Sequence, residues 1–190
     1  MKPFMGAFTV ALALLAASPV LAQHQTFAID SAASAVKMTL KTTHEIVDGT
    51  FHVESGSIDY DRNRSSISGT VVVAAGSGKT GNDSRDKKMN KDILKVQQYS
   101  TVTFTAKSYT GTIAPSGDST LQVAGVLTLL GTPHDITVPM HVHIDGAGCT
   151  AKSHFVIPYV QWGLKNPSFL IWKADNDVAI DLDLVGHLTS

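Results

Sequence analysis

The amino-acid sequence predicts a mainly β protein, built as an antiparallel sandwich or a closed barrel. Alternation of apolar and polar residues recurs along almost the whole chain, whereas one segment alone has helical spacing. The clearest signal lies between residues 121 and 144, where two β-prone runs flank a Gly/Pro/Asp break at 131–135. Such a break predicts a hairpin with a loop of about five residues. Alternation alone does not separate a sandwich from a barrel.

The first 22 residues have the three parts of a secretory signal. Lys2 gives the positive start, Phe4 to Ala17 form an apolar middle, and Val20-Leu21-Ala22 is a small-x-small cleavage site. We therefore expect a signal peptide at 1–22, a single domain at 23–190, and a location in the periplasm or outside the cell. No later apolar run is as long as a membrane-spanning helix, which needs about 18 apolar residues.

Charge and cysteine content narrow the function classes. Without Lys2 the chain has 14 basic and 16 acidic residues, since Lys and Arg total 15 in the full sequence. This weak negative balance makes nucleic acid an unsuitable partner. The single cysteine, Cys149, cannot form an internal disulfide, so an exported domain must draw its stability from its core. Cys149 follows Gly146-Ala147-Gly148 in an expected turn and is given no role.

The strand signals follow one another in order. Val36, Met38 and Leu40 alternate with lysine and threonine, as in a strand with one face in water. Gly56 suggests a bulge or bend, and residues 44–48 and 61–64 have turn composition. After a short run at 26–30, the expected strands are 36–41, 51–60, 67–73, 102–106, 121–130, 136–144, 155–159 and 178–184.

One helix is expected between Asn82 and Gln97. Asn82, Asp83 and Ser84 offer capping side chains at its start. Met89 and Ile93 then recur at helical spacing among charged residues, which predicts an amphipathic helix.

Several short patterns succeed one another in a fixed order. They are Phe27-x-Ile29-Asp30, His44 before Val47-x-Gly49-x-Phe51, Gly56-x-Ile58-x-Tyr60-Asp61, Thr80-Gly81-Asn82 before Arg85-Asp86, Asp92-Ile93-Leu94, and Gly125-x-Leu127-Thr128-Leu129-x-Gly131. In order and spacing they resemble the YceI-like family of exported lipid-binding proteins. The resemblance implies an eight-stranded antiparallel, lipocalin-like extended barrel with one α-helix beside it.

The resemblance further implies a tunnel that holds a long apolar molecule, such as a polyisoprenoid or a fatty amide. The aromatic-rich loop from Trp162 to Trp172 is expected to cover the barrel end and could contact membrane headgroups, where tryptophan rings are favoured. The sequence leaves open whether the protein forms a homodimer. The residues expected to contact the ligand are Val36, Met38, Leu40, Phe51, Val53, Phe104, Val123, Leu127, Ile136, Val138, Met140, Val142, Phe155, Ile157, Trp162, Phe169, Val178 and Ile180.

The expected role is a non-enzymatic carrier, with no catalytic residue, metal ligand or cofactor assigned. The histidines keep one alternative open, a small periplasmic hydrolase or isomerase. It would use His44 as a base, or His141 and His143 as a metal-binding pair on one strand face. No nucleophile motif such as G-x-S-x-G accompanies His44. Gly76 to Thr80 is typical of a turn and not of a P-loop, because Val73 stands where the motif needs its first glycine.

Overall fold

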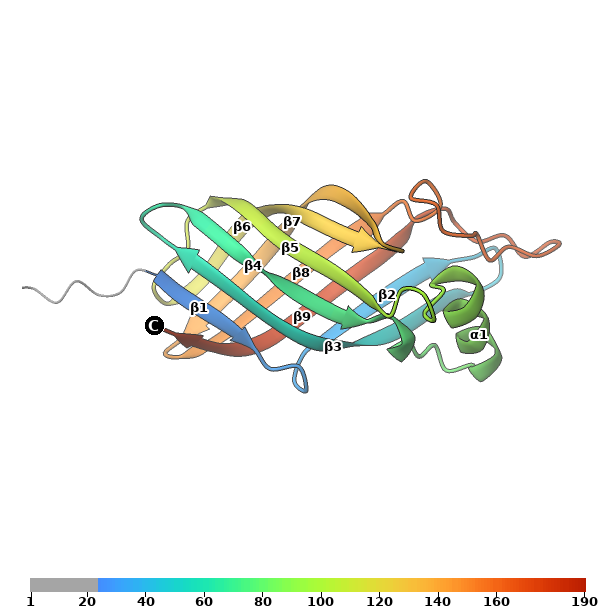
Figure 1. Ribbon diagram of the computed structural model, residues 1–190, viewed down its shortest axis with the longest axis horizontal. Coiled ribbons are helices and arrows are strands. Elements are labelled where there is room, and N and C mark those ends of the chain that lie inside the picture. The colour runs from blue at the N-terminus through green and yellow to red at the C-terminus, as the bar shows by residue number, and fades with distance from the viewer. Residues whose placement is uncertain (1–23) are drawn as a thin grey trace, which may run out of the picture.

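Residues 24–190, the part of the chain described by this computed structural model, wind into a closed antiparallel β-barrel with a short helix at one end (Figure 1). The expected signal segment, 1–22, lies outside the described residues. The strands are β1 (His24–Ile29), β2 (Ala35–Lys41), β3 (Ile46–Asp61), β4 (Ser66–Ala74), β5 (Thr101–Gly111), β6 (Gly117–Leu129), β7 (Thr132–Asp145), β8 (Gly148–Ile157) and β9 (Val178–Thr189).

The barrel closes because β1 and β2 together fill one position between β3 and β9. Both strands pair antiparallel with β3 on one side and with β9 on the other. The break between them is tied down locally. The Asp30 carboxylate accepts the N–H groups of Ala32 and Ala33, and the Ser34 hydroxyl exchanges hydrogen bonds with the Val185 backbone. Nine strands of the described chain therefore occupy eight barrel positions, which confirms the expected eight-stranded barrel and excludes the sandwich.

The β6–β7 hairpin has a shorter turn than the sequence suggested. β6 ends at Leu129 and β7 begins at Thr132, so the loop is two residues and the prediction of about five was wrong. Leu130 and Gly131 have φ values of 50° and 71°. Left-handed conformations at both turn positions match the right-handed twist of the flanking strands. Residues 132–135 consequently pair within the sheet.

Alternation along the strands fixes which side chains point inward. In β7, Val138, Met140 and Ile144 are buried, whereas His141 and His143 are exposed, as expected from the sequence. The pairing register shifts at two places, between Val53 and Ser55 in β3 and between Ala106 and Ser108 in β5. An irregularity of this kind changes which residues of a long strand face the interior of the barrel. β3 also begins at Ile46, inside the expected turn at 44–48.

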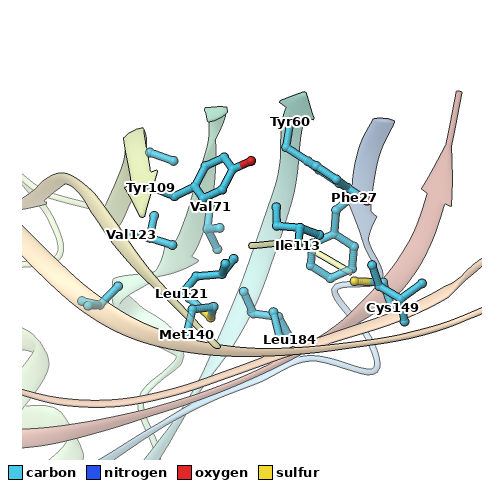
Figure 2. Packing of buried hydrophobic residues seen from close by; sticks show 14 of the residues in the cluster. Phe27, Tyr60, Val71, Tyr109, Ile113, Leu121, Val123, Met140, Cys149 and Leu184 are labelled. Atoms are coloured by element: carbon cyan, nitrogen blue, oxygen red, sulfur yellow. The ribbon is translucent and has the colours of Figure 1, made fainter. Parts of the chain in front are cut away.

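Buried side chains pack against one another inside the barrel (Figure 2), and those in and near the β5–β6 loop lie at the end away from the helix (Figure 1). Ile113, in the loop between β5 and β6, is 8% exposed and belongs to the same core cluster as Phe27, Tyr60 and Cys149. The Tyr60 hydroxyl donates to Gln25 Oε1 at 2.9 Å and accepts from Arg62 at 3.3 Å. This end is therefore packed with the protein's own residues.

The helical segment begins as α1 (Asp83–Lys88) and continues as a π-helical turn, η2 (Met89–Ile93). It follows the short 3₁₀ turn η1 (Ala75–Ser77). The Asn82 side chain accepts the N–H groups of Ser84 and Arg85, which confirms the expected cap. Within the described residues, no helix has both the length and the apolar character needed to cross a membrane.

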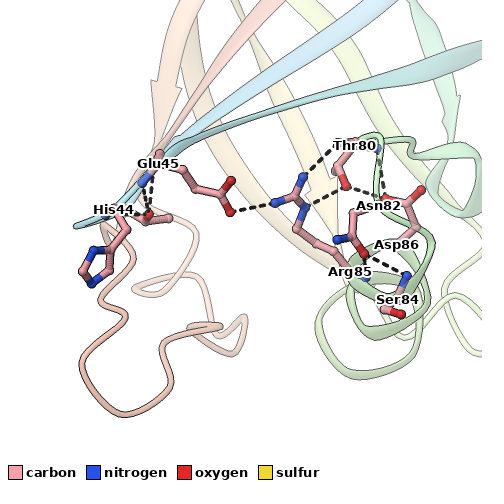
Figure 3. A network of polar contacts seen from close by, with 8 residues as sticks. His44, Glu45, Thr80, Asn82, Ser84, Arg85 and Asp86 are labelled. Atoms are coloured by element: carbon pink, nitrogen blue, oxygen red, sulfur yellow. Dashed lines mark hydrogen bonds and ion pairs between the residues drawn. The ribbon is translucent and has the colours of Figure 1, made fainter.

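A polar network docks the helix on the barrel (Figure 3). The buried Asp86 carboxylate accepts the Thr80 N–H at 3.0 Å and the Thr80 hydroxyl at 2.6 Å. Arg85 donates to the Thr80 carbonyl and hydroxyl oxygens, each at 2.9 Å. It also pairs with Glu45, the residue just before β3, at 2.9 Å. The hydrogen bonds from Thr80, helped by the nearby Lys79, hold the pKa of Asp86 below its ordinary value.

We expect Asp86→Asn to lower the Tm at neutral pH by a few degrees, because a neutral amide accepts weaker hydrogen bonds from Thr80. Since folding depresses the pKa of Asp86, its contribution is complete above the unfolded pKa of about 4 and disappears as the pH falls through the folded pKa. The Tm difference between the two proteins should therefore shrink below about pH 4. This Tm difference is measured by thermal unfolding, followed by circular dichroism, from about pH 7 to about pH 3.

Asp83→Asn is the matched control, because Asp83 lies exposed in the same helical turn. A Tm difference for Asp86→Asn that stays constant across the acid range would contradict the assignment of this carboxylate as the titrating anchor.

Candidate functional site: an apolar cavity inside the barrel

The barrel encloses a cavity of about 270 Å³. Its wall takes residues from every strand, from η2 and from the loop between β8 and β9. No residue of this lining, which lies wholly within the described chain, is charged, and Thr103 carries its one aliphatic hydroxyl. A wall of this kind offers hydrocarbon contact on all sides and very few polar partners.

Fourteen of the eighteen residues expected to contact the ligand line this cavity. They share the inward side of the barrel strands, which is where period-two alternation places them. Their role as ligand contacts stays a prediction. They are Val36, Met38, Leu40, Phe51, Phe104, Val123, Leu127, Val138, Met140, Val142, Phe155, Ile157, Val178 and Ile180.

The other four lie outside the cavity lining. Val53 is 3% exposed and sits within the core cluster beside the β3 register shift, and Ile136 packs on the core clusters. Trp162 stacks on His134 with ring centroids 4.1 Å apart and an interplanar angle of 5°. Phe169 is 65% exposed at the tip of the β8–β9 loop.

The cavity also takes residues that the sequence reasoning missed. The clearest are Ile67 and Val71 of β4 and Met89 and Ile93 of η2, each set following the period of its element. The periodic spacing of these apolar residues is visible in the sequence. The spacing does not say which face of β4 or of the helix points into the barrel, because that depends on how the barrel closes. The remaining additions are Phe27, Ile58, Tyr60, Val73, Leu94, Val102, Thr103, Ala106, Ile113, Leu121, Leu129, Ile144, Cys149, Ala151, Tyr159, Leu164, Pro167, Leu182 and Leu184.

Cys149 lies at the closed end of the cavity. It is 5% exposed and is the second residue of β8, so its expected place in a turn was wrong by one or two residues. Burial raises the pKa of its thiol to about 11. The side chain is thus protonated at neutral pH and acts as an apolar wall element.

The opposite end of the cavity is formed by η2 and the β8–β9 loop. Ile93, Leu94 and Pro167 line the cavity there and stay partly accessible, unlike the buried Phe27, Tyr60 and Ile113 at the closed end. We call the end bounded by η2 and residues 158–167 the mouth. Figure 1 shows α1 and the β8–β9 loop at the same end of the barrel.

Hydrogen bonds hold the β8–β9 loop over this end. The Tyr159 hydroxyl donates to the Asp175 carbonyl at 2.7 Å, and the Asn166 side chain donates to the Ala174 carbonyl at 3.1 Å. Burial, with the nearby Asp175 and Asp177, raises the pKa of Tyr159 to about 12, so this hydroxyl remains a donor. The Thr43 N–H also donates to the Lys173 carbonyl at 2.9 Å.

The histidines of the enzymatic alternative lie outside the cavity. His141 and His143 are exposed, and their Nδ1 atoms contact Thr120 Oγ1 at 3.3 Å and Asp118 Oδ1 at 2.7 Å. His44 packs its ring against Trp172, with centroids 4.3 Å apart. Within residues 24–190, no three His, Cys, Asp or Glu side chains are grouped so that they could hold a metal ion.

Solved structures with the same fold have low sequence identity to this chain. BcnA of Burkholderia cenocepacia is 21% identical, with a TM-score of 0.68 over 83% of this chain and 99% of that chain. A polyisoprenoid-binding domain from Saccharophagus degradans, implicated in plant cell wall breakdown, is 18% identical, with a TM-score of 0.68 over 86% and 98%. The YceI protein of Campylobacter jejuni is 21% identical, with a TM-score of 0.59 over 76% and 86%.

Comparison with curated proteins gives no match. The model of the YceI-like domain, in contrast, matches residues 27–186, from the inward-facing Phe27 of β1 almost to the end of β9. This range contains the β2–β9 pairing that helps to close the barrel, the helix and the whole cavity lining. With most of its length matched, the chain belongs to the YceI-like family.

Proposed function

We propose that this protein binds a long-chain apolar molecule, a polyisoprenoid in particular, and holds its tail in the barrel cavity as an exported carrier or buffer. The single observation that carries the proposal is the cavity itself, which is enclosed by hydrocarbon side chains and reaches the helix end of the barrel. The similar domain from Saccharophagus degradans, described as polyisoprenoid-binding, supports the choice of ligand.

The energetics of such binding need no polar anchor for the tail. Each methylene group removed from water contributes about 0.8 kcal/mol, so about ten groups contribute about 8 kcal/mol. This lies within the range of the estimated cost of association, about 4–15 kcal/mol. A longer tail, or contacts made by a head group, would then give useful affinity. The wall is built within one chain, so the proposed function needs no second copy.

Binding is favoured over catalysis by the chemistry of the wall. The lining residues, all within 24–190, include no His, Asp, Glu, Lys or Arg side chain. Acid-base or nucleophilic catalysis on a ligand held there would need such a group, or a free tyrosine hydroxyl, within hydrogen-bond reach. The hydroxyls of the two lining tyrosines, Tyr60 and Tyr159, already donate to Gln25 and to the Asp175 carbonyl. The one thiol in the lining, Cys149, is kept protonated by burial.

The tip of the β8–β9 loop supplies a surface for membrane contact in the proposed function. Phe169, Leu170, Ile171 and Trp172 are 65%, 74%, 73% and 49% exposed. Phe169 and Trp172 exchange two backbone hydrogen bonds of 2.9 Å, so the tip is a tight turn that keeps these side chains in solvent. Figure 1 shows the loop projecting beyond the barrel end. A protein that takes a lipid from a bilayer needs apolar contact beside its mouth.

Filling the cavity should weaken tail binding without unfolding the barrel. Ala151 and Ala106 are buried and line the cavity, so Ala151→Phe or Ala106→Phe places a ring in space that the tail would occupy. We expect the affinity for a prenyl lipid to fall at least about tenfold. The Tm should hold or rise, because the new ring is buried in an existing void. Displacement of a fluorescent fatty-acid probe measures the affinity, and native mass spectrometry of the purified protein measures how much of it carries lipid.

Ala124→Phe is the matched control, since Ala124 lies on β6 beside the inward Val123 but outside the lining. His44→Ala serves as the control for the enzymatic alternative, and both should bind lipid as the wild type does. A well-folded Ala151→Phe protein that still carries lipid at wild-type occupancy would refute the cavity as the site.

Removing the apolar tip should weaken membrane association and leave tail binding in solution intact. Leu170→Ser combined with Ile171→Ser removes two side chains that would each contribute about 1.5–3 kcal/mol if fully buried in lipid. We expect partitioning onto phosphatidylcholine vesicles to fall at least about tenfold in a flotation assay. Val156→Ser is the control, because Val156 is 58% exposed on the barrel side. Equal flotation of the tip variant and the wild type would contradict a membrane role for this loop.

A further inference from the structure

The backbone ladder between β7 and β8 covers only part of the two strands. It joins residues 141–145 of β7 to residues 148–152 of β8, in the half of the barrel that lies toward the closed end. In the described chain, residues 132–140 of β7 pair with β6 and residues 153–157 of β8 pair with β9, but the two stretches do not pair with each other. We call this unpaired stretch the seam. It runs from the mouth toward the middle of the barrel.

The sequence of β7 is unsuited to a continuous ladder along the seam. Pro133 and Pro139 lie in its unpaired half, and a proline has no N–H group to donate to a neighbouring strand. The Pro139 carbonyl instead accepts a hydrogen bond from the side-chain hydroxyl of Ser153, which is buried. A side chain therefore takes the place of a backbone donor at the point where the two strands cease to pair.

Side-chain contacts close the seam. Ile136 on β7 and Phe155 on β8 each pack against both core clusters. At the mouth, the ring of His134, near the start of β7, stacks on Trp162 of the β8–β9 loop. The Nε2 atom of His134 is buried and has no hydrogen-bond partner among the described residues, so stacking rather than a bond from this nitrogen holds the ring. Contacts of this kind can separate without the loss of a ladder hydrogen bond.

The seam lies directly over the apolar cavity. Val138 and Met140 on its β7 side line the cavity, and so do Phe155 and Ile157 on its β8 side. The ladders on either side of the seam, β6–β7 and β8–β9, continue along its whole length. Movement of β7 away from β8 would therefore open the cavity wall and leave both flanking hairpins intact.

We propose that the seam is the gate of the cavity. β7 and β8 separate at the mouth to admit or release an apolar tail, and the stack of His134 on Trp162 is the latch that holds them together. This inference rests on the proposed function and states how access to that site is controlled. Local opening takes place where few hydrogen bonds must break, and opening steps of this kind commonly limit ligand exchange. The gate is continuous with the mouth, so the tail enters at the end away from Ile113.

The first test ties the two strands together across the seam. If the ladder continued in register, Thr137 would lie opposite Val156, and both residues are exposed. Thr137→Cys and Val156→Cys, in a Cys149→Ala background, are joined by a short bis-methanethiosulfonate linker that a reductant removes. We expect the linked protein to release a fluorescent fatty-acid probe at least about tenfold more slowly, and reduction to restore the rate. Stopped-flow fluorescence measures this release into excess geranylgeraniol.

The control joins Thr137→Cys to Gln122→Cys with the same linker in the same background. Gln122 is exposed on β6, and the ladder between β6 and β7 already holds these two strands together. Its release rate should therefore equal that of the unlinked protein. An unchanged release rate in the protein linked across the seam would overturn the gate and leave the proposed function standing. A wild type that binds neither the probe nor geranylgeraniol would overturn the proposed function itself.

A second test removes the latch. His134→Ala should raise the uptake and release rates of the probe together, each at least about tenfold, while the dissociation constant changes by less than about threefold. His134→Phe keeps a ring for Trp162 to stack on and should restore the wild-type rates. His44→Ala is the matched control, because it removes a ring from Trp172 at the β2–β3 turn, away from the seam. Wild-type rates in a His134→Ala protein with native circular dichroism would refute the latch.

Discussion

The structure depends on the closure of one antiparallel sheet, in which β9 returns to pair with β1 and β2. Closure satisfies the backbone hydrogen bonds of strands that would otherwise form sheet edges. It also turns the apolar face of every strand toward a common axis. Eight positions give a barrel whose side chains do not fill the whole interior, so the same pairings that stabilise the fold leave the cavity.

Much of the barrel could be predicted, because inward and outward residues alternate so regularly in β6, β7 and β9. That pattern correctly placed residues such as Val123, Val138 and Ile180 on the cavity wall. It failed where local geometry overrides composition. Leu130 adopts a positive φ that leucine rarely takes, so the two-residue turn was read as a longer loop. The predicted signal segment lies outside the described residues and stays a prediction.

The site was less predictable than the fold, since it joins residues that are distant in the sequence. Leu94 and Leu164 are 70 positions apart and line the same cavity only because the residues after η2 and the β8–β9 loop border one end of the barrel. Asp86 reads as an ordinary first-turn acid, and its bonds to Thr80 become visible only with the folded loop before α1.

Ile113 and its buried neighbours close one end of the lumen, and this gives the tube a fixed depth. Under the proposed function, entry and exit would then share a single route, so the terminal methyl group would go in first and come out last. A hydrocarbon longer than that depth leaves methylenes in water, and a shorter one leaves wall atoms without contact. In the proposed function the blind tube would therefore act as a gauge of chain length, and substitutions near Ile113 would change the length it favours.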